Sequence, residues 1–190
     1  IMEEFMILAW DSGLKLGSRV HELDEIEEAV KTDITIKTSI LESRFIHGSR
    51  YLWVHFQNKL SNIRFFNQKE FILEKMDEHK QRLLNNPLNM QPNIKDGYGG
   101  MRESNMLFWI AKVIYGIKNP KDLVGKVFTE IQYKEYRSSL EYIFRIRNAL
   151  HLIAKKKQDI VTFDLMPDIA LKLGFADTTT LTKERQCISK

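Results

Sequence analysis

Cysteine is almost absent from this sequence of 190 residues, in which Cys187 stands alone. One thiol excludes an intrachain disulfide and a zinc site of several cysteines, and it favours the reducing cytoplasm. No apolar run approaches the roughly 18 residues that a membrane-spanning helix needs, so we expect no membrane-spanning segment. The five histidines show no HxxxH or HD pairing, and we expect no metal site made by this chain alone.

Proline and glycine are also scarce, with four and nine residues, so few positions interrupt regular structure. Hydrophobic residues make up 43% and charged residues 28%, which is the composition of a soluble globular domain with a substantial core. We expect one domain, or one domain and a fragment of another. The sequence begins at Ile1 inside a run with a helical pattern, and we expect it to be cut from a longer protein.

Apolar residues recur at helical spacing over most of the chain, which predicts a mainly α fold, a multi-helix bundle-like domain. Residues 14–20 alternate apolar and other residues with a period of two, which predicts a strand and hence a short α/β remnant at the N-terminus. Caps and breakers place the expected helices at about 1–12, 24–32, 34–46, 51–60, 68–85, 103–115, 132–157 and 164–173, with a last one after 178–180. Asp24 and Asp33 are the expected caps of the second and third of these helices, and Gly116 is expected to end the sixth.

The most informative segment is a glycine-rich loop, PNIKDGYGGMR, at residues 92–102. Its glycines permit positive φ and close approach to a ligand, a helix starts directly after it, and Lys95 and Arg102 flank it. Free N–H groups at a helix start together with two cations predict a phosphate site. The spacing fits neither a Walker loop nor GxGxxG, so a purely structural turn is the alternative.

Two further groups of polar residues lie on expected helices. Arg147, Asn148 and His151 approach one another beside the apolar stripe of the long helix, as an anion contact or as an internal hydrogen-bond network. Arg44 lies on the expected helix 34–46, whose polar edge suits either solvent or a neighbouring domain.

The formal net charge of +4 is unevenly distributed. Residues 1–50 hold ten acidic and six basic side chains, whereas residues 51–190 hold fifteen and twenty-three. A basic C-terminal portion suits nucleic acid, nucleotide phosphates or an acidic protein partner. The sequence has no helix-turn-helix signature and no patterned aromatic and basic surface, so a nucleic-acid-binding module is the less favoured alternative.

Four blocks in order carry a family resemblance: LAWDSGLKLG, DITIKTSILESRFIHG, PNIKDGYGGMRESNMLFWIAK, and RIRNALHLIAKK followed by FDLMPDIALKLGF. Together they resemble the bacterial bifunctional uridylyltransferases and uridylyl-removing enzymes that modify the nitrogen-regulatory PII protein. A related glycine element occurs in glutamine synthetase adenylyltransferases, which are the alternative within enzymes.

The resemblance implies a parent enzyme with a nucleotidyltransferase domain, a helical domain, a metal-dependent HD domain and ACT domains. Residues 1–32 would be the end of the nucleotidyltransferase domain, and residues 33–190 the helical domain. Magnesium and UTP would be bound through a Gly-Gly…Asp-x-Asp motif that this sequence lacks. The resemblance therefore implies no catalytic residue in this chain and no activity of the chain alone.

The resemblance also implies that the residues already named face the nucleotide cleft of the parent enzyme. Five of them would face the nucleotide cleft, namely Lys95, Gly97, Gly99, Gly100 and Arg102. Secondary candidates for lining the same cleft are Arg44, Arg147, Asn148 and His151. The implied reaction is attack of a PII tyrosine hydroxyl on the α-phosphate of UTP, with release of pyrophosphate.

Overall fold

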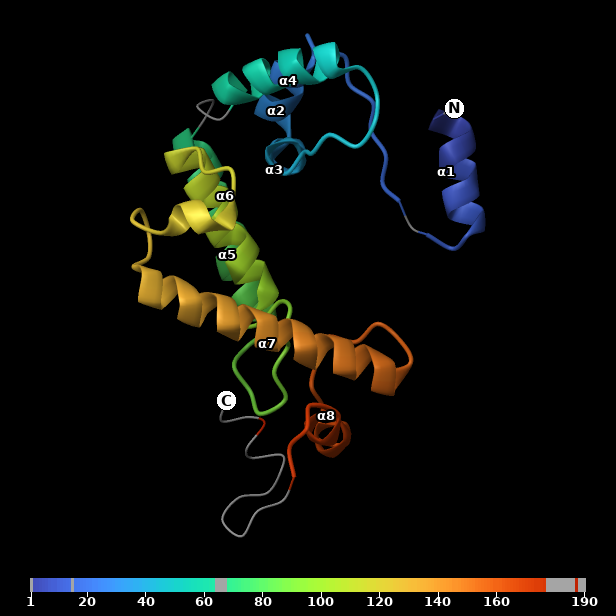
Figure 1. Cartoon of the computed structure of the whole chain (residues 1–190), viewed down its shortest axis with the longest axis vertical. Helices are drawn as coiled ribbons and strands as arrows, with labels where there is room; N and C mark the ends of the chain where they lie inside the picture. The colour runs from blue at the N-terminus through green and yellow to red at the C-terminus, as the bar shows by residue number, and fades with distance from the viewer. Residues whose placement is uncertain (1, 15, 64–67, 177–186, 188–190) are drawn as a thin grey trace.

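The computed structural model describes residues 2–14, 16–63, 68–176 and 187. Within them the chain is mainly helical, as expected, with eight α-helices and one 3₁₀ helix (Figure 1). The α-helices are α1 (Met2–Asp11), α2 (Ile26–Thr32), α3 (Ile34–Leu41), α4 (Arg50–Ile63), α5 (Gln68–Asn85), α6 (Met101–Tyr115), α7 (Glu130–Ala154) and α8 (Met166–Lys172), and the 3₁₀ helix η1 is Pro120–Leu123. The helix expected after residues 178–180 lies outside the described residues.

The helices begin and end at residues whose side chains or backbone supply the missing hydrogen bonds. Asp33 caps α3, with its Oδ1 accepting from the Thr35 N–H at 2.7 Å. Thr129 and Gln132 form a capping box at the start of α7. Gly116 ends α6 with a φ of 63°, a left-handed conformation that glycine adopts at little cost.

Three local expectations are wrong. Leu14 and residues 16–20 are irregular, without the expected strand, because no neighbouring strand in the described residues satisfies their backbone groups. The helix expected over 34–46 ends at Leu41, so Arg44 lies in the connection to α4. Asp24 does not cap α2; its carboxylate instead pairs with the Lys59 ammonium at 3.0 Å.

The core is a series of clusters along the molecule rather than one centre. Figure 1 shows α2, α3 and α4 grouped at one end, α5 and α6 side by side in the middle, and α7 crossing below them. Apolar clusters occupy the α2–α3–α4 group, the α3–α5–α6 junction, the α6–α7 junction and the α7–α8 junction. The long helix α7 therefore connects the centre of the molecule to its C-terminal end.

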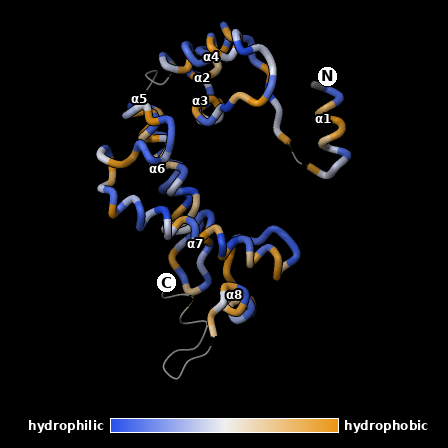
Figure 2. Tube along the Cα trace, in the orientation of Figure 1, coloured by the Kyte–Doolittle hydropathy of each residue, from blue (hydrophilic) through white to orange (hydrophobic). Residues whose placement is uncertain are grey.

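Helix α1 is set apart from the other helices in Figure 1. It carries apolar residues along its length (Figure 2), and Phe5, Leu8 and Trp10 are each more than half exposed. Most other helices show a mixture of apolar and polar residues in Figure 2, as amphipathic helices do.

Candidate functional site

The glycine-rich loop between α5 and α6 is organised by Asn93. Its side-chain oxygen accepts hydrogen bonds from the backbone N–H groups of Lys95 and Asp96 at 3.0 and 2.9 Å. Its amide nitrogen donates to the Asn86 side chain at 2.9 Å, and its carbonyl accepts from the Gly97 N–H at 2.9 Å. The loop therefore has a defined shape, in which Lys95 and Asp96 are adjacent on the turn.

The three glycines of this loop have different physical roles. Gly99 has a φ of 68°, a conformation that L side chains rarely adopt. A Cβ added to Gly97 would lie 2.6 Å from the Asn93 carbonyl oxygen. A Cβ at Gly100 would lie 2.8 Å from the carbonyl oxygens of both Gly97 and Lys95. The glycines thus permit the chain to fold tightly on itself, which the structural-turn interpretation anticipated.

The backbone N–H groups at the start of α6 are used within the loop. The Met101 N–H donates to the Ile94 carbonyl at 3.1 Å, and the Arg102 N–H donates to the Lys95 carbonyl at 3.0 Å. The Gly99 N–H donates to the Glu103 carboxylate at 2.8 Å. The expectation of free N–H groups at this helix start is therefore wrong for these positions, and a phosphate here would depend on side-chain cations.

A second segment, residues 159–161, is attached to the loop by main-chain hydrogen bonds. The Ile94 N–H donates to the Asp159 carbonyl at 2.9 Å, and the Val161 N–H donates to the Pro92 carbonyl at 3.0 Å. Between them, Asn93 and Ile160 form an isolated antiparallel bridge. This pairing places Asp159, which follows the end of α7, against the glycine loop.

Asp159 is the centre of an ionic network that joins the loop to α7. The Arg147 Nε donates to its Oδ1 at 2.7 Å, the Lys95 Nζ lies 3.9 Å from its Oδ2, and the His151 Nε2 lies 3.6 Å from its Oδ1. The side chain of Asp159 is only 13% exposed. No pattern in the sequence singled out Asp159. Arg147 and His151 indicated an anion contact or a hydrogen-bond network, but no spacing showed which carboxylate would meet them.

A second carboxylate balances the exposed side of the loop. Asp96 lies 3.6 Å from the Lys95 Nζ and 3.6 Å from the Arg102 Nε. The side chain of Arg102 is 42% exposed and that of Lys95 24%, so both reach the surface. With Arg147, three permanent cations meet these two carboxylates, and the Glu103 carboxylate, which accepts from the Gly99 N–H, balances the third cation.

The charges around Asp159 set its pKa. Burial would raise the pKa of this carboxyl, but the Arg147 hydrogen bond and the positive charges of Arg147, Lys95 and His151 outweigh burial and hold the pKa below its usual value. Asp159 is therefore ionised at neutral pH. The His151 Nε2 is buried without a hydrogen-bond partner among the described residues, and it faces this anion.

The remaining sequence candidates do not join this cluster. Asn148, on the same helix as Arg147, is exposed and does not take part in the ionic network. Arg44 lies near Lys112 and Gly116 at the C-terminal end of α6, whereas the glycine loop is at its N-terminal end. A helix of 15 residues is about 22 Å long, so Arg44 belongs to a different surface.

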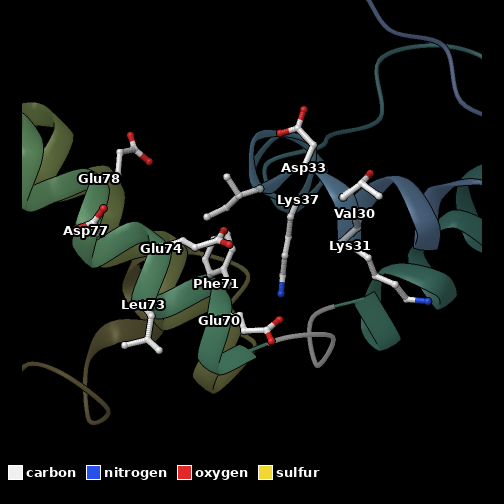
Figure 3. A pocket seen from close by; sticks show the side chains of 12 residues that line it. Val30, Lys31, Asp33, Lys37, Glu70, Phe71, Leu73, Glu74, Asp77 and Glu78 are labelled. Atoms are coloured by element: carbon white, nitrogen blue, oxygen red, sulfur yellow. The ribbon is translucent and has the colours of Figure 1, made fainter.

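Figure 3 shows a separate cleft, of about 720 Å³, between the α2–α3 connection and α5. Lys37 extends into it from α3, and Glu70, Glu74, Asp77 and Glu78 follow one another along α5. Burial lowers the pKa of Lys37, and the charges of Glu70 and Glu74 oppose that change. The cleft is acidic and so does not suit a phosphate.

Comparison with known families decides the identity of the chain. The family described as GlnD PII-uridylyltransferase matches residues 70–187. The chain belongs to this family. Among curated relatives, bifunctional uridylyltransferase/uridylyl-removing enzymes of Novosphingobium aromaticivorans and Azotobacter vinelandii are 33% and 36% identical to it, and each match covers 93% of the chain. A Bradyrhizobium enzyme of the same description is 31% identical over 92% of the chain.

The chain spans about a fifth of the length of these PII-uridylyltransferase relatives. The family match begins in α5 and includes both the glycine loop and Asp159. No solved structure matches the chain.

Among the described residues, no group of three or more histidine, cysteine, aspartate or glutamate side chains is arranged to hold a metal ion. In the same part of the chain, no helix is long and apolar enough to cross a membrane.

Proposed function

We propose that the chain is the helical part of an enzyme that transfers uridylyl groups from UTP to the PII protein and removes them. Family membership supports this proposal. Residues 33–190 would form the helical domain, and residues 1–32 would belong to the end of a preceding nucleotidyltransferase domain. PII and the nucleotidyltransferase, HD and ACT domains of the parent would be the partners, in the cytoplasm.

In this proposal the loop that carries Lys95 and Arg102 faces the nucleotide. The single observation that carries it is the ionic cluster that holds both cations at the surface of a hydrogen-bonded loop. Their side chains would offset charge on the UTP phosphates as pyrophosphate leaves. Lys95 is positioned for this role by Asp159, and Arg102 by Asp96.

Magnesium ligands and the catalytic carboxylates would come from outside this chain. The donor set supports this division, because Asp96 and Asp159 are already paired with arginine and lysine, and the Glu103 carboxylate accepts from the Gly99 N–H. When bound, magnesium would polarise the UTP phosphates. The 190-residue chain alone, supplied with UTP and magnesium, is expected to show no transfer to PII.

The test uses the full-length protein with Lys95→Ala and Arg102→Ala combined. Loss of two charge-assisted contacts is expected to lower kcat/KM for uridylylation by about tenfold or more, with helicity unchanged in circular dichroism. Lys80→Ala removes an exposed cation from α5 and is the matched control. Transfer kinetics equal to those of the control would exclude the phosphate contact.

A further inference from the structure

Side chains at the end of α5 are linked by hydrogen bonds and close polar contacts to the glycine loop that follows it. Helices α5 and α6 pack side by side, and the loop connects the end of the first to the start of the second (Figure 1). Two separate sets of contacts involve the loop, one near its start and one near its end. They decide where the loop stands relative to the two helices.

Asn86 holds the start of the loop. Its Oδ1 accepts a hydrogen bond from the Asn93 side-chain amide at 2.9 Å, and its Nδ2 donates to the Arg82 carbonyl at 3.0 Å. The Asn93 side chain in turn accepts from the N–H groups of Lys95 and Asp96. Asn86 therefore stands between the last turn of a helix and the residue that shapes the turn carrying Lys95.

Glu103 holds the end of the loop, from the first turn of α6. Its Oε2 accepts from the Gly99 N–H at 2.8 Å, and its Oε1 lies 3.6 Å from the His79 Nε2. The Arg82 guanidinium contacts the other ring nitrogen of His79 at 3.0 Å. Because arginine can only donate, the His79 Nδ1 accepts, and the proton of the neutral ring lies on Nε2, facing Glu103. This second set of contacts does not pass through Asn86.

We propose that Asn86 is a positioning residue for uridylyl transfer: through Asn93, it holds Lys95 where a bound phosphate needs its charge. This role rests on the proposed function, since the phosphate contact of Lys95 belongs to it. Side chains that bind or stabilise a reacting group must be held within about 0.5 Å of the productive geometry, and hydrogen bonds from residues behind them provide this. Because a misplacement of about 1 Å can cost two orders of magnitude in rate, loss of such a residue lowers kcat more than it raises KM.

The test uses the full-length protein with Asn86→Leu, a change of similar size that removes both side-chain hydrogen bonds. We expect kcat for uridylyl transfer to fall about tenfold, with KM for UTP within about twofold of the parent value. Asn86→Asp keeps an acceptor oxygen for the Asn93 amide, and it is expected to return kcat to within about threefold of the parent. Asn85→Leu makes the same change at an exposed neighbour and is the matched control. Circular dichroism checks that each variant is folded.

Backbone amide chemical shifts of the 190-residue chain test the same link without enzyme activity. Asn86→Leu is expected to move the amide signals of Lys95 and Asp96, and to leave that of Gly99, which Glu103 holds, in place. Unmoved Lys95 and Asp96 signals would overturn the positioning role. Movement of Gly99 as well would show that the whole loop has refolded, and it would overturn a local role.

The kinetic results also separate the positioning role from the proposed function. If Lys95→Ala combined with Arg102→Ala lowers transfer while Asn86→Leu behaves like Asn85→Leu, the positioning role fails and the phosphate contact stands. If the double variant has no effect either, both fail. A fall in kcat for Asn86→Leu that Asn86→Asp does not restore would also overturn the role, because the acceptor for Asn93 would then not be the cause.

Discussion

Arg147 donates a 2.7 Å hydrogen bond to Asp159, from the last third of α7 to the segment that follows it. The Lys95 ammonium and the His151 ring also lie beside the Asp159 carboxylate, and the Asp159 main-chain carbonyl accepts from the Ile94 N–H. One aspartate therefore fixes three parts of the chain relative to one another: the glycine loop, the end of α7 and the approach to α8. This relationship gives the first two predictions.

Asp159→Asn is expected to destabilise the chain by about 1–3 kcal/mol, because Arg147 and Lys95 lose a largely buried anion and then repel each other. Urea unfolding followed by circular dichroism measures the change. Asp164→Asn is the control, since Asp164 is exposed and the substitution is expected to cost less than about 0.5 kcal/mol. Equal stability of the two variants would mean that the network contributes nothing.

The stability of the chain is expected to depend on the ionisation of Asp159. Its pKa is lower in the folded chain than in the unfolded chain, so its contribution is complete above about pH 4, the ordinary pKa of an aspartate. The contribution is lost as pH falls through the lower, folded value. Unfolding free energies measured between pH 7 and pH 2.5 should fall less steeply for Asp159→Asn than for the parent chain. Parallel curves would refute the assignment.

The loop glycines are expected to respond unequally to alanine. Gly97→Ala and Gly100→Ala place a Cβ within 2.8 Å of backbone carbonyl oxygens, and each should cost about 2–3 kcal/mol because the loop must shift. Gly99→Ala meets no atom within 4 Å and should cost only about 1 kcal/mol for its positive φ. Thermal unfolding of the three variants gives the order, and a larger loss for Gly99→Ala would contradict the loop geometry.

The junction between α3 and α6 offers an independent prediction. The Trp109 indole N–H donates to the Glu42 carboxylate at 2.6 Å, across 67 residues of sequence. Trp109→Phe is expected to destabilise the chain by about 1.5–3 kcal/mol, since a charge-assisted hydrogen bond is lost at a side chain that is 7% exposed. Trp10→Phe on the exposed α1 is the matched control and should stay within about 0.5 kcal/mol. Chemical denaturation monitored by circular dichroism compares them.

Local signals in the sequence were sufficient for most of the helices. Asp33, Gly116 and the periodic apolar stripe of α7 act within a few residues of themselves, so their effect could be predicted from spacing. The prediction of a strand over 14–20 was wrong because a strand needs a neighbouring strand, and spacing within one segment cannot reveal whether that neighbour exists. The end of α3 at Leu41 was not predicted because the apolar pattern continues past this residue. In the structure, the Glu42 carboxylate that follows accepts a hydrogen bond from the Trp109 indole.

By itself, the sequence determined a mainly helical chain, a tight glycine loop flanked by Lys95 and Arg102, and the family resemblance. Only the tertiary structure decided what these cations contact: it brought Asp159 against Lys95 and placed Arg44 at the far end of α6. The physical reason is that helix caps and glycine turns depend on neighbouring residues, whereas an ion pair depends on how distant segments pack. A residue's type and spacing predict its local conformation, but the partner of its charge depends on the tertiary fold.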